Sequence, residues 1–571
     1  MAETTDQLVR ICLAQINPVV GDIKRNADKI ISSINLAESC NADIVVFPEL
    51  SLSGYPPEDL LFKSSFLAQV NTQLKRIVRA SNSIVSIVGY PHRREGKLFN
   101  SAAVISRQSI RYNYHKIHLP NFGVFDEKRY FYSGSEYPVI TLGNAGRFGL
   151  NICRDIWEDA GMQVYRLRAG FVDAIINISS SPFQVGKHND RTKLIARRAR
   201  QTCAYVLYCN LVGGQDELVF DGGSFAVNPQ GKVIARGKQF EEDFMVTDIP
   251  VRTGNRPHKG KQKTPLGFHT VHIPHVLTQR ASAVPLRIDA YMSRWEEVYS
   301  ALVLGLRDYV QKNKFTKVVI GLSGGIDSSL TAAIAVDALG CDNVIGLTMP
   351  SVYSSDAARE DAQVLAQNLQ ISFKKISIQT IYNTYLTFLK KHFKGHQVNT
   401  AEENIQARIR GNILMAFSNK FNWLVLTTGN KSEISVGYCT LYGDTAGGFA
   451  VLKDIPKTWV YKLTEWQNKQ YASPRIPISI VKRPPTAELK PNQRDQDSLP
   501  PYNILDSLIE QYVEKRRDIA SIRLNGCSLK RIKHIIDLID AAEYKRRQSP
   551  PGIKITPLAF GKDRRMPITH K

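Results

Sequence analysis

The chain of 571 residues lacks any apolar run long enough to cross a bilayer, which excludes a conventional transmembrane helix. Met1 to Arg10 carries acids and amides rather than a basic cluster followed by an apolar stretch, so no secretory signal is visible. The eight cysteines include no Cys-x-x-Cys pair, which gives a zinc site little support. We therefore expect a cytoplasmic protein with reduced thiols and no membrane partner.

One segment lacks charge of one sign. Between Asp248 and Asp289 there is no acidic residue, and prolines and glycines are interspersed with lysine, arginine and histidine. This composition is typical of a connector or crossing segment. Because the chain is too long for one ordinary core, we expect two α/β domains, at residues 8–250 and 287–571, joined by a connector at 251–286.

Positive charge is in excess, with 75 lysines and arginines against 52 acids and a net charge of +23. Nucleic acid is one class of partner that such a charge fits. Polyphosphate substrates are another, since they need lysine and arginine around them. A basic surface that only aids solubility is the third and simplest explanation. Charge alone leaves all three open.

Strands and helices alternate along both halves of the chain. In the first half the expected strands are 11–16, 44–47, 84–89, 102–106, 148–152, 174–178, 204–209 and 223–227, and the expected helices are 26–38, 66–80 and 190–202. In the second half the expected strands are 317–321, 343–349, 371–378 and 423–428, and the expected helices are 328–339, 355–369 and 404–419. The regular alternation in the second half predicts a doubly wound parallel sheet, whose ligands bind at the carboxyl ends of its strands.

A phosphate-binding loop is predicted where an apolar strand runs into Ser323-Gly-Gly-Ile-Asp-Ser328 and then a helix. Gly324 and Gly325 allow close approach of an anion and positive φ. Their amides, the serine hydroxyls and the helix N-terminus together form a phosphate site. Asp327 offers a carboxylate to Mg²⁺ on that phosphate. No Gly-Lys-Ser/Thr follows, so this is not a Walker loop, and a simple helix-capping turn is the weaker alternative.

A second polar loop follows the strand expected at 423–428. It carries Glu433, and two carboxylates at one sheet edge can hold a metal between triphosphate oxygens. Thr428 and Lys431 stand where they could meet a nucleotide. Taken alone, Glu433 would be an ordinary acid in the first turn of a helix.

The hexapeptide at 323–328 looks like the loop of ATP enzymes that adenylate a carboxyl or carbonyl oxygen and release pyrophosphate. Residues 402–411, 424–448, 485–489, 497–502 and 544–548 resemble the NAD synthetase family. The resemblance implies that ATP is bound by Gly321, Leu322, Ser323, Gly324, Gly325, Ile326, Asp327, Ser328 and Thr428. It implies that deamido-NAD is bound by Asn404, Arg408, Glu433 and Lys545. It also implies Mg²⁺ as the cofactor, held by Asp327 and Glu433.

Three positions in the first half carry a second chemistry. Glu49 ends an apolar strand, Lys116 lies in a polar segment, and Cys153 comes just after another apolar strand. Taken singly, Glu49 is more simply explained as a capping acid, Lys116 as a surface lysine and Cys153 as a buried thiol. Together, a thiol nucleophile, a proton acceptor and a cation near the developing oxyanion are what amide cleavage requires. A neighbouring ammonium also lowers the pKa of a thiol.

In order and in the strings around them, these three residues resemble the nitrilase superfamily of carbon–nitrogen hydrolases. The resemblance implies a four-layer αββα sandwich with Cys153 as nucleophile, Glu49 as general base and Lys116 as the oxyanion stabiliser. Glu127 would be a second carboxylate that orients the set. Glutamine would be held by Phe122, Ser181 and Lys187. Two positions depart from the family pattern, because many relatives have tyrosine at position 122 and an acid at position 154, where this chain has arginine.

Together the resemblances cover nearly the whole chain and indicate a glutamine-dependent NAD synthetase, a carbon–nitrogen ligase. The implied reaction converts deamido-NAD, ATP, L-glutamine and water into NAD, AMP, diphosphate and L-glutamate. It would proceed through an adenylated intermediate, with ammonia passed between the two sites through an internal tunnel. We expect a homo-oligomer without a nucleic-acid partner, since the positive charge then serves ATP, pyrophosphate and an anionic dinucleotide.

Two rival functions remain at this stage. An adenylating enzyme that modifies RNA would use the same loop, but it would need an RNA-binding module or catalytic cysteines near the loop, and we find neither in the sequence. A non-catalytic scaffold would have no reason to keep Glu49, Lys116, Cys153, Asp327 and Glu433 together.

Overall fold

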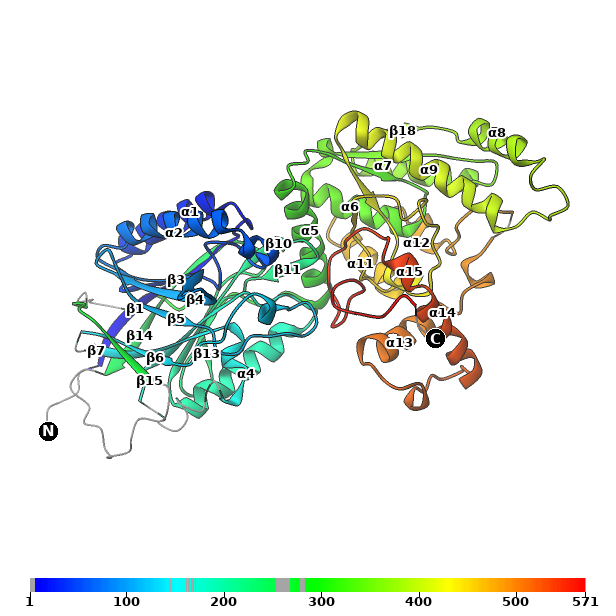
Figure 1. The fold of residues 1–571 in the computed structure, drawn as a ribbon. Coiled ribbons are helices and arrows are strands. Elements are labelled where there is room, and N and C mark those ends of the chain that lie inside the picture. The colour runs from blue at the N-terminus through cyan, green and yellow to red at the C-terminus, as the bar shows by residue number, and fades with distance from the viewer. Residues whose placement is uncertain are drawn as a thin grey trace. The chain divides into compact units, whose positions relative to one another are not determined.

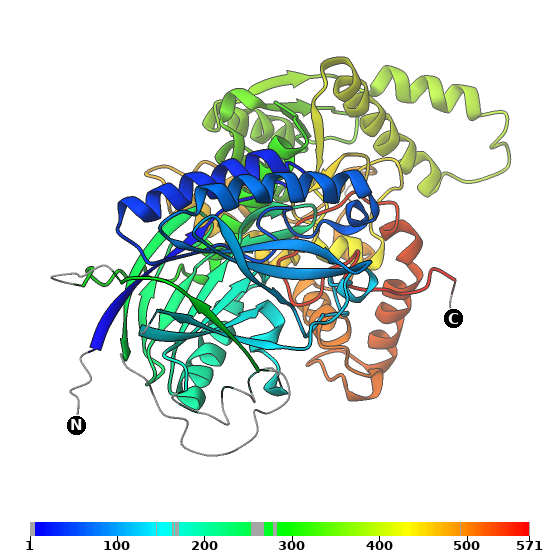
Figure 2. The same ribbon diagram turned by 60° about the vertical axis from the view of Figure 1, so that its left-hand side comes forward.

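The computed structural model describes residues 6–143, 145–160, 162, 165, 169, 171–252, 268–277, 283–491 and 493–569. The chain forms two compact units, drawn in Figures 1 and 2. The first contains residues 1–215 and 219–292, and the second contains residues 216–218 and 293–571. Of the expected connector, residues 253–267 and 278–282 lie outside the described residues.

Two sheets form the centre of the first unit. The first has six strands in the order β14-β1-β2-β3-β4-β5, namely Asp243–Arg252, Asp6–Gln15, Ile44–Val46, Val85–Arg94, Lys97–Ser106 and Ser109–His115. The second has seven in the order β13-β12-β9-β8-β7-β6-β15, namely Val233–Arg236, Phe225–Val227, Tyr205–Asn210, Ala174–Ser179, Ala145–Ile152, Tyr137–Leu142 and Phe268–Ile273. A separate pair joins β10 (Val212–Gln215) to β11 (Leu218–Asp221).

Apolar side chains from both sheets form one core. Ile11 and Ile87 of the first sheet and Phe148 and Ile176 of the second belong to the same buried cluster, so the sheets pack face to face. Helices α1 (Ile23–Ser39) and α2 (Ser64–Ala80) cover the outer face of the first sheet (Figures 1 and 2). Helix α4 (Lys187–Thr202) covers the outer face of the second. The predicted four-layer αββα sandwich is confirmed.

The expected connector contributes a strand to this sandwich. β15 (Phe268–Ile273) pairs in parallel with β6 (Tyr137–Leu142) at the edge of the seven-stranded sheet. Its alternation is short and its flanks are rich in proline and glycine, so the sequence pattern alone did not separate it from a linker.

The second unit is built on a five-stranded parallel sheet in the order β18-β17-β16-β19-β20. In that order the strands are Ser372–Lys375, Val344–Thr348, Val318–Gly321, Leu424–Thr427 and Phe449–Ala450. The chain runs outward from β16 to β18 and then returns to β19 on the other side of β16. The predicted doubly wound parallel sheet is confirmed, and its strand order reverses between β16 and β19.

Helices surround this sheet. Helix α5 (Arg294–Lys312) precedes the first strand, and those that connect the strands are α6 (Ile326–Leu339), α7 (Asp356–Asn368), α8 (Gln379–Leu389), α9 (Thr400–Phe421) and α10 (Lys431–Val436). The later ones are α11 (Lys457–Asn468), α12 (Ile478–Lys482), α13 (Tyr502–Ile509), α14 (Leu529–Ala541) and α15 (Glu543–Arg546). Among the described residues, no helix combines the length and the apolarity that a membrane span requires.

Candidate active sites

The first unit brings Glu49, Lys116 and Cys153 into one buried cluster. They follow β2, β5 and β7 respectively, and all three are buried. The ammonium of Lys116 lies 2.6 Å from a carboxylate oxygen of Glu49 and 2.8 Å from one of Glu127. Charges on Glu49, Lys116 and Glu127 all act on the Cys153 thiol. A lysine clamped between two carboxylates beside a thiol is an arrangement suited to amide cleavage.

Neighbouring polar groups fix the two carboxylates. Asn100 donates through Nδ2 to Glu49 at 2.7 Å, and the backbone amide of Ser180 donates to the other oxygen of Glu49 at 2.9 Å. The hydroxyl of Tyr55 donates to Glu127 at 2.9 Å. Sequence reasoning missed Asn100, Ser180 and Tyr55, because no local pattern shows that they meet Glu49 and Glu127. Each carboxylate therefore has fixed partners besides Lys116.

A fully buried carboxylate, Asp155, connects the cysteine turn with the lysine segment. Its Oδ2 accepts from the amide of Ile152 at 3.0 Å and from the hydroxyl of Tyr114 at 2.7 Å. Its Oδ1 accepts from the amides of Ile117 and His118 at 3.2 and 2.8 Å. These donors flank Cys153 on one side and Lys116 on the other, so one side chain fixes the nucleophile relative to the cation.

Burial controls protonation in this cluster. Burial and the charge of Glu49 raise the pKa of the Cys153 thiol to about 12, although Lys116 opposes the shift. Burial raises the pKa of Glu127 to about 7 against the attraction of Lys116. Burial would lower the pKa of Lys116, but the charges of Glu127 and Glu49 outweigh it and raise that pKa. The resting nucleophile is therefore a neutral thiol, and attack requires a base to take its proton.

The three predicted glutamine-holding residues differ in their surroundings. Ser181 is buried and its amide donates to Asn210 Oδ1 at 3.1 Å. Lys187 is the first residue of α4 and donates to the carbonyl of Pro182 at 2.8 Å. Phe122 is 52% exposed, and the guanidinium of Arg154 lies 5.0 Å from the centre of its ring. The two departures from the family pattern, Phe122 and Arg154, are thus in contact with each other.

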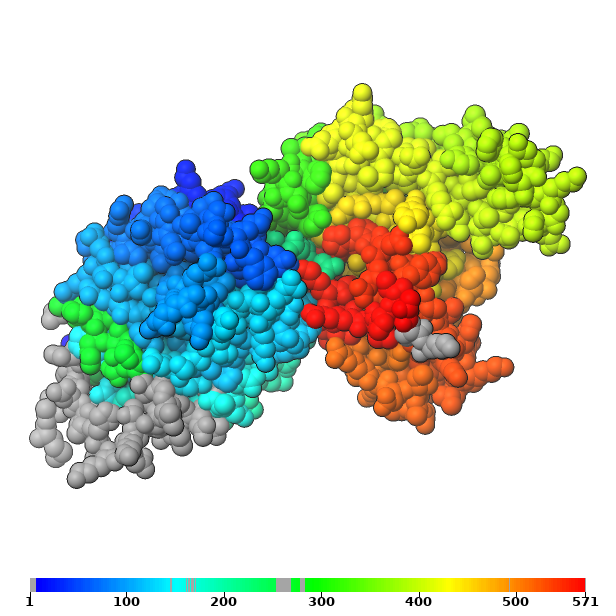
Figure 3. Space-filling model, viewed as in Figure 1, coloured from blue at the N-terminus to red at the C-terminus, as the bar shows by residue number. Residues whose placement is uncertain are grey.

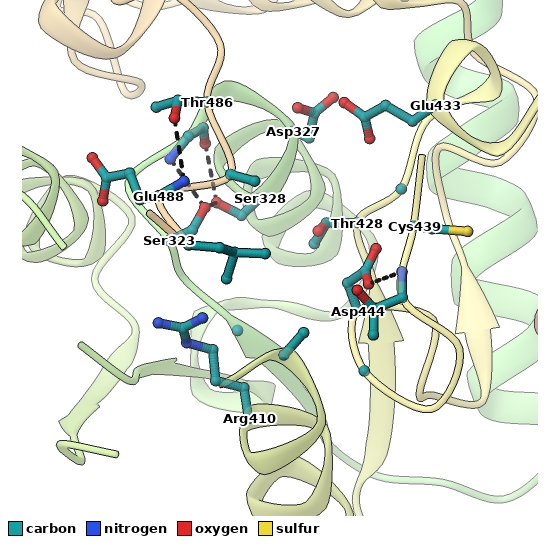
Figure 4. A pocket seen from close by; sticks show the side chains of 18 of the residues that line it. Ser323, Asp327, Ser328, Arg410, Thr428, Glu433, Cys439, Asp444, Thr486 and Glu488 are labelled. Carbon is teal, nitrogen blue, oxygen red and sulfur yellow. Dashed lines mark hydrogen bonds between the residues drawn. The ribbon is translucent and has the colours of Figure 1, made fainter. Parts of the chain in front are cut away.

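The second unit contains a cavity of about 550 Å³ at the carboxyl ends of β16, β17 and β19 (Figure 4). Its lining includes every residue predicted to bind ATP: Gly321, Leu322, Ser323, Gly324, Gly325, Ile326, Asp327, Ser328 and Thr428. It also includes Asn404, Glu433 and Lys545 of the predicted dinucleotide site. This is the switch point of the sheet, where such folds bind ligands.

The two glycines of the loop have different roles. Gly324 has φ of +80°, and a Cβ there would lie 2.2 Å from the carbonyl oxygen of Ala358, so only glycine fits. Gly325 has φ of −91°, and the expectation that it takes a positive φ was wrong. It lies at the start of α6, and its amide donates to Ser323 Oγ at 3.2 Å.

Asp327 and Glu433 face each other across Lys457. The ammonium of Lys457 lies 2.5 Å from Asp327 Oδ2 and 3.1 Å from Glu433 Oε1. Asn430 donates to Asp327 Oδ1 at 2.9 Å and accepts from the amide of Glu433, which joins the two loops. Sequence reasoning missed Lys457, whose only local mark is its place after Pro456 at the start of α11.

Protonation in this second cluster follows burial and charge. Burial raises the pKa of Glu433 to about 7, with Lys457 opposing and Asp327 adding to the shift. Burial would lower the pKa of Lys457, but Asp327 and Glu433 outweigh it and raise that pKa. The lysine is therefore firmly charged between two acids.

The carboxylates of Asp327 and Glu433 fit Mg²⁺ by donor type, since this cation prefers oxygen ligands and keeps phosphate oxygens in its shell. Among the described residues, no group of three or more His, Cys, Asp or Glu side chains could hold a metal by itself. A metal at this position would therefore share its ligands between these two carboxylates and a bound triphosphate.

Of the residues predicted to bind the dinucleotide, some line the cavity and one does not. Asn404 lies on the cavity wall and accepts from Thr440 at 2.7 Å. Lys545 lies on the wall and donates to the carbonyls of Gly437 and Cys439. Arg408 is exposed on α9, donates to the carbonyl of Leu441, and is not part of the cavity lining.

The folds and sites define a hydrolase of carbon–nitrogen bonds joined to an ATP-type phosphate-loop unit. The profile of the carbon-nitrogen hydrolase family matches residues 10–256, and the profile of the NAD synthase family matches residues 298–549. Each profile matches most of the unit in which we find the corresponding cluster.

Full-length relatives combine both units in one chain. The glutamine-dependent NAD(+) synthetase of Thermotoga maritima is 45% identical over 571 residues, with 99% of each chain covered. That of Aquifex aeolicus is 45% identical over 576 residues, with 99% of this chain and 100% of the relative covered. The solved glutamine-dependent NAD+ synthetase of Acinetobacter baumannii has a TM-score of 0.74 at 37% identity, covering 98% of each chain. The chain belongs to the glutamine-dependent NAD+ synthetases, and its activity is glutamine-dependent synthesis of NAD+.

Proposed function

We propose that the two clusters divide the reaction between them. The second unit takes deamido-NAD and ATP and forms an adenylated carboxylate and diphosphate. The first unit takes L-glutamine and releases ammonia and L-glutamate. Ammonia then displaces AMP to give NAD. The observation that carries this division is that the cavity and the thiol cluster each assemble from side chains of one unit.

In the second unit, ATP lies with its phosphates on the loop from Ser323 to Ser328. The solved Acinetobacter baumannii relative contains ADP, which supports a nucleotide here. When Mg²⁺ is bound, held by Asp327 and Glu433, it supplies charge neutralisation for the triphosphate. Lys457 stands between these acids and offers its ammonium to the same phosphates.

Adenylation makes the nicotinate carboxylate reactive. A carboxylate oxygen attacks the α-phosphorus of ATP and diphosphate leaves, so the carbonyl carbon gains AMP as its leaving group. Ammonia adds to that carbon, and a proton and AMP depart as the amide forms. Asn404 and Lys545 on the cavity wall support placing the deamido-NAD here, and Arg408 would meet it outside the cavity.

In the first unit, Glu49 takes the proton of the Cys153 thiol as the sulfur attacks the glutamine amide. Lys116 stabilises the negative oxygen of the tetrahedral adduct. Glu49 then gives the proton to departing ammonia and leaves a glutamyl thioester, which water hydrolyses to L-glutamate. Phe122, Ser181 and Lys187 hold the amino acid, with Arg154 packed on Phe122.

We also propose that the protein forms a homo-oligomer. Helix α8, at the outer edge of the second unit in Figures 1 and 3, exposes Ile381, Tyr385 and Phe388 at helical spacing. Exposed apolar side chains of this size support a contact with another copy. The mass measured in solution by light scattering tests it: a Phe388→Ser variant that keeps the wild-type mass would reject this contact surface.

One assay tests the division of labour. Purified protein receives ATP, Mg²⁺ and deamido-NAD, with either glutamine or ammonium, and NAD, AMP and glutamate are measured together. Equal amounts of NAD and AMP are expected with both nitrogen sources, and glutamate only with glutamine. NAD formation without AMP would reject adenylation.

A further inference from the structure

Arg410, on α9, contributes a guanidinium to the wall of the cavity in the second unit. Its Nε donates to the carbonyl of Met349 at 3.0 Å, just beyond the end of β17. This bond fixes one edge of the planar group. Among the described residues it is the only hydrogen bond that this side chain makes.

No carboxylate within the described part of the chain forms an ion pair with Arg410. Burial lowers the pKa of Arg410 to about 10, and Glu488 is the charge that opposes the shift. The carboxylate of Glu488 is itself engaged by the hydroxyl of Ser355 at 2.8 Å. A largely desolvated cation with no carboxylate in ion-pair contact is costly, and a ligand that covers it with electron-rich atoms stabilises it.

The cavity wall next to Arg410 is apolar. A Cβ built on Gly321 would lie 3.5 Å from Leu414 and 3.6 Å from Met349, so the three residues converge on one surface. Leu347 adds to the same lining. Apolar side chains beside a planar cation form a slot that suits a flat aromatic ring.

The position of Arg410 relative to Asp327 and Glu433 indicates which part of a bound nucleotide would occupy this slot. In Figure 4, Arg410 lies on the opposite side of the hollow from Asp327 and Glu433. The phosphates belong near those two carboxylates and the loop at 323–328. A nucleotide held there at its phosphate end extends its base toward Arg410.

We propose that Arg410 is a binding residue for the purine ring of ATP, with its guanidinium stacked on the base and held in plane by the Met349 carbonyl. The assignment rests on the proposed function, in which ATP occupies the loop at 323–328. The recognised group is the flat, electron-rich base, and the triphosphate is bound elsewhere in the cavity.

Kinetics with ammonium as the nitrogen source test this role, because the thiol cluster then takes no part. In Arg410→Met, the KM for ATP is expected to rise about 10- to 30-fold, as the loss of a desolvated cation–π contact predicts, with kcat within about threefold. Arg410→Lys keeps the positive charge but lacks a planar guanidinium group, so we expect its KM for ATP to rise nearly as much as that of Arg410→Met. Inorganic tripolyphosphate, which has no base, should inhibit both variants with its wild-type inhibition constant.

Two results would overturn the assignment. If the inhibition constant of tripolyphosphate rises by the same factor as the KM for ATP, the guanidinium binds phosphate. If Arg410→Lys keeps the wild-type KM for ATP, only the charge at this position matters. Lys420→Met, an exposed change on the same helix, is the matched control. Wild-type AMP formation is measured first: its absence rejects the proposed function, whereas its presence with an unchanged KM in both variants rejects only the role of Arg410.

Discussion

The ammonium of Lys457 lies 3.1 Å from the carboxylate of Glu433 and bridges it to Asp327 (labelled with Glu433 in Figure 4). These residues are separated by as many as 130 positions in the chain. The lysine places a fixed positive charge at the edge of the sheet where the phosphate loop and the second acidic loop meet. It thereby belongs to the residues that we propose to act on the bound nucleotide.

Replacement of Lys457 by methionine is expected to lower the rate of AMP formation about 10²- to 10³-fold, because a preorganised cation facing the phosphates is lost. The loss should be equal with glutamine and with ammonium, measured as initial rates at saturating ATP. Lys462→Met, an exposed change on the same helix, serves as control. A variant that still makes AMP at the wild-type rate would remove Lys457 from the mechanism.

Replacement of Cys153 by alanine should abolish glutamine-dependent NAD formation and leave the ammonium-dependent rate within about twofold. In the proposed mechanism the thiol attacks the amide, whereas ammonium bypasses that step. Glutamate and NAD are quantified in the same reactions. Cys203→Ala, an exposed cysteine in the same unit, is the matched control. Equal loss with both nitrogen sources would contradict separate sites.

The glutamine-dependent rate is expected to rise as pH increases through about 7. Burial holds the pKa of Glu127 near that value, and its ionised form is the acceptor for Lys116 and Tyr55. A Glu127→Gln variant should lose this inflection, while the ammonium-dependent profile of the same variant stays as in wild type. An inflection that persists in the variant would assign it to another group.

Stability should respond to the same group with a defined sign. Folded protein holds the Glu127 proton up to about pH 7, whereas the unfolded chain releases it near 4.5. The folded state therefore binds more protons between these values, and its free energy of unfolding falls as pH rises through this window. Denaturant titrations should show this decline in wild type and a smaller one in Glu127→Gln.

Removal of Mg²⁺ by a chelator is expected to stop AMP formation without stopping the release of glutamate from glutamine. The carboxylates that we propose as metal ligands, Asp327 and Glu433, belong to the second unit, and the thiol cluster contains neither of them. Adding Mg²⁺ back should restore AMP. Unchanged AMP formation in metal-free buffer would reject the metal site.

Asp155→Asn should lower the free energy of unfolding by about 1–3 kcal/mol, because buried donors lose an acceptor oxygen. Tyr114→Phe, which removes one of the four donors, should cost about 1 kcal/mol. Both changes are expected to lower glutamine turnover more than ammonium turnover. Chemical denaturation and the glutamine- and ammonium-dependent rates check this. An unchanged denaturation midpoint in Asp155→Asn would show that the carboxylate does not stabilise the segments of Cys153 and Lys116.

Much of the fold follows from local pattern. Strand β16 and helix α6 appear within two residues of the ranges expected from sequence. By contrast, β15 lies in a stretch that reads as a linker, because its pairing with β6 joins positions about 130 residues apart. Whether such a segment forms an edge strand is determined by tertiary packing rather than by the intrinsic strand propensity of its residues.

The sequence by itself determined which chemistries the chain carries: a thiol after one strand, a lysine and acids after others, and a glycine loop between a strand and a helix. Local spacing fixes such strand-end positions. Only the tertiary structure decided that Asp155 joins the turn of Cys153 to the segment of Lys116, and that Lys457 and Arg410 line the cavity of the second unit. These contacts depend on the register and packing of elements far apart in the chain, which no local pattern encodes.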